Sequence, residues 1–171
     1  MNLYMITLGG KVKNGNIEVH DIQFLAANHV DDTVELLKST WYGLPQKLHM
    51  DSYKVINGAD GFTVRLTKEK PTGSKQLYFV HLGGYKKEST QEQHEVGLFV
   101  GETEQEVKER AVKEMIAAEI DNHVDSIVSV EACMMSSDDE TYYIELCESQ
   151  ENFNCEPDWF GYRRLDLEIT K

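Results

Sequence analysis

The sequence predicts an α+β fold made of two tandem ββαββ-like repeats related by a pseudo-twofold axis, with mainly antiparallel sheet and one helix per repeat. Two observations lead to this prediction. The 171-residue chain repeats itself after 74 positions, and each copy contains several strand-like segments but one segment with the helical spacing of apolar residues. One helix per repeat can cover one face of its sheet.

The repeat is clear when residues 3–56 are paired with residues 77–130 without a gap. Twelve of the fifty-four pairs are identical, whereas unrelated sequences of average composition match at about 6% of positions. Duplication is the simplest explanation. The identical positions of the first copy are Leu3, Tyr4, Leu8, Gly9, Gly10, Lys13, Glu18, His20, Glu35, His49, Asp51 and Ser52.

The repeats are expected to divide one compact module into three parts. Residues 1–67 form the first repeat, residues 68–76 form a linker, and residues 77–171 form the second repeat with a C-terminal extension. The linker segment is polar and contains Pro71 and Gly73, which favours irregular structure.

The first two strands of each repeat are expected to form a hairpin. The segments YMITL and YFVHL are rich in β-branched and aromatic residues, which favours strands. Gly-Gly follows each of them and predicts a turn, because glycine takes positive φ without steric cost. Residues 17–26 and 91–100 predict the second strands.

One apolar face runs along each predicted helix. In the first repeat the apolar residues are four, three and four positions apart, and Asn28 or its neighbour is expected as the N-cap. In the second repeat, Thr103 and Glu106 form a capping-box pattern. The apolar faces consist of Val30, Val34, Leu37 and Trp41 and of Val107, Ala111, Met115 and Ala118.

The later strands follow the helices. Residues 49–56 and 123–130 predict third strands, and residues 61–66 and 141–146 predict fourth strands after a six-residue insertion in the second copy. Residues 160–169 predict one more strand. Pairing of two chains as a homodimer would cover strand edges that the single chain leaves exposed.

Charge and cysteine content narrow the class of protein. Seventeen Lys and Arg against thirty Asp and Glu give a net charge of −13, which repels nucleic-acid phosphates, so no nucleic acid is expected as a partner. No apolar run approaches the roughly 20 residues that span a bilayer, so no membrane association is expected. The three cysteines, Cys133, Cys147 and Cys155, are odd in number and widely spaced, which favours free thiols and a cytoplasmic location.

The repeated histidines accompany repeated carboxylates. Residues two apart on a strand share a face, so each Glu-x-His and His-x-Asp pair points to one side. If the second and third strands of a repeat lie side by side, their imidazoles and carboxylates converge. The candidate ligand-binding residues are Glu18, His20, His49 and Asp51 in the first repeat and Glu92, His94, His123 and Asp125 in the second.

Two classes of function remain open for these residues. The preferred interpretation is a non-enzymatic, soluble binding or interaction protein that needs no cofactor. The alternative is a metal-assisted hydrolase or oxygenase-like enzyme, with Zn or Fe on His20 and His49 or on His94 and His123, since imidazole and carboxylate are common ligands of both metals. A purely structural role, in which Glu and His hydrogen-bond loop amides or each other, would also explain their repetition.

The pattern resembles that of a small bacterial family described as a domain of unknown function, which occurs in one or two copies per chain. The resemblance covers most of residues 3–66 and, less closely, residues 77–146. The second copy departs from it where Glu95 replaces Asp21 and Thr90 replaces Asn16. The resemblance implies a tandem architecture and a bacterial origin, and no particular activity. It rests on Leu8, Gly9, Gly10, Glu18, His20, Asp21, His49, Asp51 and Ser52.

Overall fold

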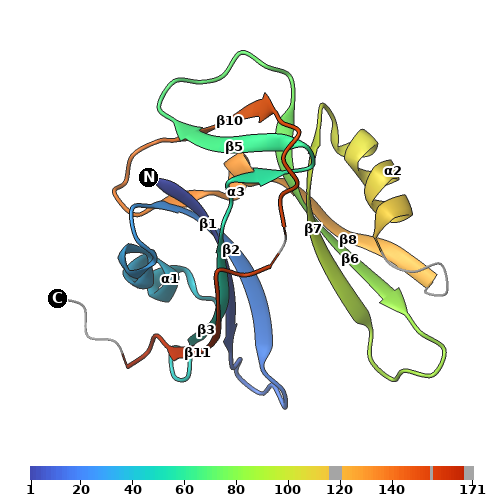
Figure 1. Ribbon diagram of the computed structural model, residues 1–171. Coiled ribbons are helices and arrows are strands. Elements are labelled where there is room, and N and C mark those ends of the chain that lie inside the picture. Colours follow the sequence, from blue (N-terminus) through green and yellow to red (C-terminus); the bar gives the residue numbers. More distant parts are fainter. Residues whose placement is uncertain (116–120, 155, 168–171) are drawn as a thin grey trace. The chain divides into compact units, whose positions relative to one another are not determined.

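Most of the regular structure is β-strand, as the sequence predicts. The computed structural model describes residues 1–115, 121–154 and 156–167. Within these ranges the sheets are mostly antiparallel and few helices accompany them, so the fold is of the α+β class (Figure 1). The chain divides into two compact units. Unit 1 contains Met1–Asn57, Met134–Tyr142 and Asn154–Lys171, and unit 2 contains Gly58–Cys133 and Tyr143–Phe153.

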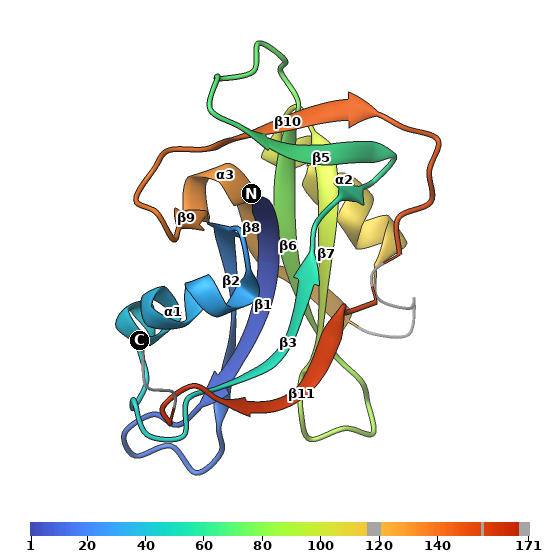
Figure 2. The ribbon, with the colours of Figure 1, turned by 60° about the vertical axis from the view of Figure 1, so that its left-hand side comes forward.

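A five-stranded sheet forms the centre of unit 1, in the order β11-β3-β1-β2-β9 (Figure 2). Strand β2 is followed by the 3-10 helix η1 (Val30–Thr33) and by α1 (Val34–Thr40), whose Val34 and Leu37 are buried in the core of the unit. Two strands from the C-terminal part of the chain, β9 and β11, therefore complete the sheet that the first repeat begins. The strands are β1 (Asn2–Gly10), β2 (Val19–Ala27), β3 (His49–Val55), β9 (Met135–Ser136) and β11 (Trp159–Arg164).

Unit 2 contains two three-stranded sheets, in the orders β7-β6-β8 and β10-β5-β4. Helix α2 (Glu104–Glu114) packs against β6, β7 and β8, and the short helix α3 (Val130–Cys133) follows β8 (Figure 1). The strands are β4 (Gly58–Ala59), β5 (Phe62–Thr67), β6 (Gln76–Tyr85), β7 (Gln93–Gly101), β8 (Asp121–Ser129) and β10 (Tyr143–Glu148).

The two repeats share one register. Strand β1 pairs with β2 and β3, and β6 pairs with β7 and β8, so the expected hairpins are confirmed. Each core uses the same positions, because residues 74 apart face the same way on equivalent strands and helices. Tyr4, Ile6, Leu8, Leu25 and Leu37 are buried in unit 1, and Tyr78, Val80, Leu82, Phe99 and Ala111 are buried in unit 2.

The expected Gly-Gly turns are wrong. Gly9 and Gly10 end β1, and Gly83 and Gly84 lie within β6. Among the described residues, positive φ occurs in glycine at Gly61 and Gly161. The chain turns in the segments after these strands. Glycine is needed within the strands because side chains from neighbouring strands approach the backbone closely there.

The fourth strands of the two repeats pair with each other. Strand β5 contains the predicted segment 61–66 except its first residue, and β10 begins at Tyr143 within the predicted segment 141–146. Tyr143 pairs with Thr67 and Glu148 with Phe62 in an antiparallel ladder. Each repeat therefore contributes three of its strands, β1–β3 or β6–β8, to one sheet, and residues 58–67 belong to unit 2.

The predicted helix starts are confirmed. The N-cap of η1 is His29, the neighbour of Asn28, and Thr103 caps α2 by accepting a hydrogen bond from the Glu106 N–H at 3.2 Å. The first helix begins with a 3-10 turn. Ala118, expected on the second apolar face, lies outside the described residues.

Two further expectations concern the cysteines and membrane-spanning segments. Cys133 and Cys147 are free thiols, and burial raises the pKa of Cys133; Cys155 lies outside the described residues. In the part of the chain that the structure describes, no helix is both long and apolar enough to cross a bilayer.

Candidate functional site

Each repeat has a glycine at the centre of a row of histidines. Gly9 on β1 pairs with His20 on β2 and with His49 on β3, so the central residue of the row has no side chain. Gly83 pairs with His94 and His123 in the same way. The second and third strands of each repeat are therefore not side by side, the condition under which we considered that these groups could converge. The histidines meet across the central strand, because glycine leaves the space above it open.

The first group of polar side chains, here called the repeat-1 cluster, contains Glu18, His20, His49 and Asp51. His20 Nε2 lies 3.7 Å from Glu18 Oε1 and 3.4 Å from Asp51 Oδ2. His49 Nε2 lies 3.8 Å from Glu18 Oε2 and 3.3 Å from Asp51 Oδ1. Each imidazole nitrogen thus faces two carboxylates, and the four predicted residues of the first repeat are brought together.

A β-bulge helps to place each aspartate. In β3, Ser52 pairs with Thr7 and Met50 pairs with Leu8, so Asp51 is the extra residue between them. Asp125 occupies the same position between Ser126 and Val124. A bulge twists the strand and redirects a side chain, which accounts for the repetition of the sequence His-x-Asp-Ser.

His49 is held in one orientation. Its Nδ1 lies 2.7 Å from the carbonyl oxygen of Lys47. Since a carbonyl only accepts hydrogen bonds, Nδ1 carries the hydrogen, and Nε2 faces the carboxylates. The side chain is only 2% exposed, and the Tyr162 ring from β11 lies over it with a centroid distance of 4.2 Å. A hydrogen bond of this kind on the far nitrogen is typical of metal-ligating histidines.

Asp166 ties the chain after β11 to the segment before His49. Its carboxylate accepts hydrogen bonds from Arg164 Nε and Nη2, both at 2.6 Å, and from the Lys47 N–H at 2.7 Å. The Arg164 bonds are the largest cause that holds the pKa of Asp166 well below its usual range. The strand that covers His49 is therefore fastened by a charged group.

Unit 1 is expected to lose stability in acid through Asp166. Above about pH 5, one unit above the ordinary pKa of aspartate, the carboxylate is charged in both the folded and unfolded chain and its stabilisation is complete. Below that value the unfolded chain takes up a proton before the folded chain does, so the stabilisation declines as the pH falls further. Asp166→Asn should lower the urea midpoint at pH 7 and differ less from the wild type at pH 3. An equal difference at both pH values would contradict this prediction.

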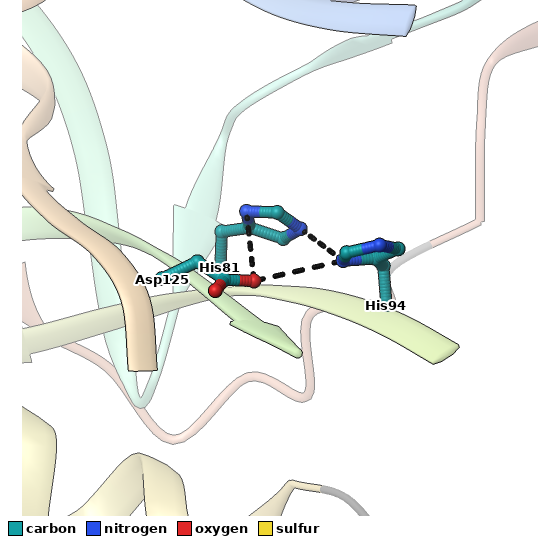
Figure 3. Close-up of side chains that lie close together, drawn as sticks. All are labelled: His81, His94 and Asp125. Atoms are coloured by element: carbon teal, nitrogen blue, oxygen red, sulfur yellow. Dashed lines mark hydrogen bonds and ion pairs between the residues drawn. The ribbon is translucent and has the colours of Figure 1, made fainter. Parts of the chain in front are cut away.

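The repeat-2 cluster contains the four predicted residues Glu92, His94, His123 and Asp125, together with His81. His123 Nε2 lies 3.1 Å from Glu92 Oε1 and 2.9 Å from Asp125 Oδ1. His94 Nε2 lies 3.6 Å from Glu92 Oε2, while its Nδ1 lies 3.6 Å from Asp125 Oδ2. Figure 3 shows that His81 and His94 both point toward the Asp125 carboxylate.

The glycine is needed in the second repeat as well. A Cβ atom at Gly83 would lie 2.7 Å from both Asp125 Oδ2 and Glu92 Oε1 and 2.9 Å from His123 Nε2. Glu92 Oε1 is buried and has no hydrogen-bond partner. Buried polar atoms normally have a partner, and the group at ion-pair distance from this oxygen is His123 Nε2, 3.1 Å away.

Tyr85 borders the repeat-2 cluster. Its ring stacks on His123 with a centroid distance of 5.8 Å. The negative charge of Glu92 is the largest cause that raises the pKa of Tyr85, and Asp125 adds to it. Both carboxylates therefore project a negative field at the mouth of this cluster.

Three aromatic or imidazole groups of these clusters were missed by sequence reasoning. His81 stands at the position of Thr7 in the first repeat, so a search for identical pairs passes over it. Tyr85 likewise matches Lys11, and Tyr162 comes from a strand outside the repeat. His81 alone carried a usable signal, because it lies two residues before Gly83 on the same strand and so on the same face.

Comparisons with known proteins bear on both repeats. The family described as Domain of Unknown Function (DUF1543) matches residues 15–66 and 89–140. The two matches begin and end at the same 74-residue offset and include all eight predicted residues. Among solved structures, the crystal structure of a protein Il1583 from Idiomarina loihiensis is similar, with a TM-score of 0.70 and 27% identity over 96% of this chain and 97% of that chain. Comparison with curated proteins gave no match.

Proposed function

Because this chain belongs to the DUF1543 family and carries two copies of its domain, we propose that it is a metal-binding protein with at least one divalent transition-metal ion in each repeat. The ligands are the two imidazoles and two carboxylates of each cluster. The observation that carries the proposal is the convergence of these groups above Gly9 and again above Gly83.

The spacing of the polar atoms supports a common ion. Two ligand atoms bound at about 2.1 Å to one tetrahedral ion lie roughly 3.4 Å apart. The four imidazole-to-carboxylate distances of the repeat-1 cluster are 3.7, 3.4, 3.8 and 3.3 Å. Direct charge-assisted hydrogen bonds are shorter, about 2.7–2.9 Å. The distances in this cluster are longer than such hydrogen bonds and close to the separation of two ligand atoms on one ion.

The orientation of His49 supports the same conclusion. A neutral His49 with its hydrogen on Nδ1 would direct its Nε2 lone pair at two carboxylates, a contact that is repulsive unless a positive charge lies between them. A metal ion supplies that charge. The acidity of the whole chain, with a net charge of −13, also attracts cations to such a site.

The structural alternative is a set of ion pairs between protonated histidines and carboxylates. It explains the attraction as well as a metal does, since an imidazolium Nε2 carries its own positive charge. It also gives Glu92 Oε1 a partner, because this buried oxygen makes no hydrogen bond but lies 3.1 Å from His123 Nε2. The two explanations differ in their response to metal, which makes a direct test available.

The proposal is tested by metal analysis. Protein purified without a polyhistidine tag and treated with a chelator should bind Zn²⁺ in calorimetry, with at least one ion per repeat. Zinc at 100 times its dissociation constant should stabilise the fold by about 2.7 kcal/mol. Asp51→Asn combined with Asp125→Asn should weaken binding by more than about 100-fold, since even second-shell partners are worth about 10–100-fold.

His29 offers a matched control. It is the one histidine of the sequence outside both clusters, and it caps η1. His29→Asn removes an imidazole and keeps a good N-cap residue, so zinc binding should be unchanged. If the wild type binds no zinc and its thermal unfolding does not respond to zinc, the clusters are ion-pair networks and the proposal fails.

Further observations bear on the location of the protein, on its partners and on the relation between its repeats. The free thiols of Cys133 and Cys147 favour the reducing cytoplasm, and the strongly negative charge disfavours nucleic acid as a partner. The shared register of the repeats supports their descent from one metal-binding unit, with the pseudo-twofold axis and the homodimer as predictions from the sequence.

A further inference from the structure

We infer that the repeat-2 cluster is a dinuclear metal centre in which the Asp125 carboxylate bridges two ions. The inference rests on the metal binding proposed above and adds a second ion to it. It follows from a difference between the two repeats, because the second repeat has five candidate ligand residues where the first has four.

Two sets of ligand atoms in this cluster are compact enough to hold an ion. Within each set the atoms lie within 4.8 Å of one another. One set is formed by His81, His94 and Asp125, and the other by Glu92, His123 and Asp125. Asp125 is the residue that they share.

The two oxygens of Asp125 face different sets. Oδ2 lies 3.6 Å from His81 Nδ1 and 3.6 Å from His94 Nδ1. Figure 3 marks both contacts with dashed lines. Oδ1 lies 2.9 Å from His123 Nε2. A carboxylate that turns one oxygen to each of two ligand sets is in the position of a bridge between ions about 3.5–4 Å apart, the separation found in two-metal sites.

The second ion would be bound by the Glu92 carboxylate. Its Oε1 lies 3.1 Å from His123 Nε2 and is the buried atom without a hydrogen-bond partner. A cation held by Glu92 Oε1, His123 Nε2 and Asp125 Oδ1 satisfies it.

The first ion takes the place of a hydrogen bond. His81 Nε2 lies 2.9 Å from His94 Nδ1, so one imidazole donates to the other. The rings are nearly parallel, with an interplanar angle of 28°. Binding of an ion at His94 Nδ1 would exchange this hydrogen bond for a metal–ligand bond, and the His94 side chain, 49% accessible, has room to rotate.

The first repeat lacks the ligand residues for a second ion. Thr7 replaces His81, and His20 directs the same nitrogen, Nε2, at both of its carboxylates. Its His49 is 2% exposed beneath Tyr162, whereas His123 is 45% exposed. We therefore expect one ion in the first repeat and two in the second.

The test counts ions in the full-length chain with the first cluster disabled. In Asp51→Asn protein, Mn²⁺ should bind the second repeat with a stoichiometry of two in calorimetry, and its electron paramagnetic resonance spectrum should show two coupled ions. Adding His81→Thr, the residue that the first repeat has at this position, should reduce the count to one and remove the coupling. Adding Asp125→Asn should weaken binding of both ions. His29→Asn in the same background should still bind two.

Each other outcome has a separate meaning. A single uncoupled Mn²⁺ that is unaffected by His81→Thr overturns the dinuclear centre and leaves the proposed metal binding in place. Binding of no Mn²⁺ and no Zn²⁺ by the wild type overturns both. A folded state of each variant, shown by its circular dichroism spectrum, makes a loss of ions attributable to the missing ligand.

Discussion

Gly9→Ala is expected to lower the free energy of unfolding by about 2–3 kcal/mol, the upper part of the range for overpacking a buried site. The new Cβ would lie 2.4 Å from His49 Nε2 and 2.9 Å from His49 Cε1. The imidazole cannot move away, because Nδ1 is bonded to the Lys47 carbonyl and the Tyr162 ring covers it. Urea denaturation of the variant and the wild type measures the difference.

Gly83→Ala is the matched substitution, and it should cost less than about 1 kcal/mol. The atoms that its Cβ meets are the ends of the Asp125, Glu92 and His123 side chains, which are 27%, 27% and 45% exposed. These side chains can rotate into solvent. The variant should therefore stay folded while it loses metal binding, whereas equal destabilisation by Gly9→Ala and Gly83→Ala would show that the covering of His49 does not matter.

Asp60→Asn is expected to destabilise unit 2 by about 1.5–3 kcal/mol, the value of hydrogen bonds to a charged group. The Asp60 carboxylate accepts bonds from Arg110 Nη1 and Nη2 at 2.9 and 2.6 Å and from the Val100 N–H at 2.7 Å. These bonds join the turn between β4 and β5 to β7 and α2. Asp60 also raises the pKa of Arg110, which stays charged throughout the accessible pH range.

The choice of asparagine isolates the lost charge. Asp60 has a φ of 51°, and asparagine tolerates this left-handed conformation nearly as well as aspartate. Asp139, exposed and with a φ of 57°, provides the control. Asp139→Asn should change the free energy of unfolding, measured by urea denaturation, by less than about 0.5 kcal/mol. A similar small effect of Asp60→Asn would mean that the Arg110 pair contributes little.

The repeat could be recognised from the sequence because strand register depends on spacing. The offset of 74 residues holds for both ladders of each sheet, including the bulges at Asp51 and Asp125. Any inserted residue would have reversed the faces of the strand after it. The Glu-x-His and His-x-Asp pairs could be assigned to one face for the same reason, since side chains alternate along a strand.

The glycines show where local rules fail. Gly9 was expected in a turn because glycine favours turns, and nothing near it in the sequence indicates that an imidazole forty residues away covers it. For the same reason the sequence did not indicate the contact of Tyr162, on β11, with His49. Contacts of this kind depend on which strands become neighbours, and strand order is decided by the packing of the whole sheet.

By itself, the sequence determined that this protein is a duplicated α+β chain with repeated Glu-x-His and His-x-Asp pairs, each on one face of its strand. Periodicity and repetition carry that information, and both are properties of the chain alone. Only the tertiary structure decided that the pairs meet across a glycine in a central strand, that β5 and β10 pair with each other, and that His81 joins the second cluster. These features arise from contacts between distant segments, whose free energy exists only once the sheets have formed.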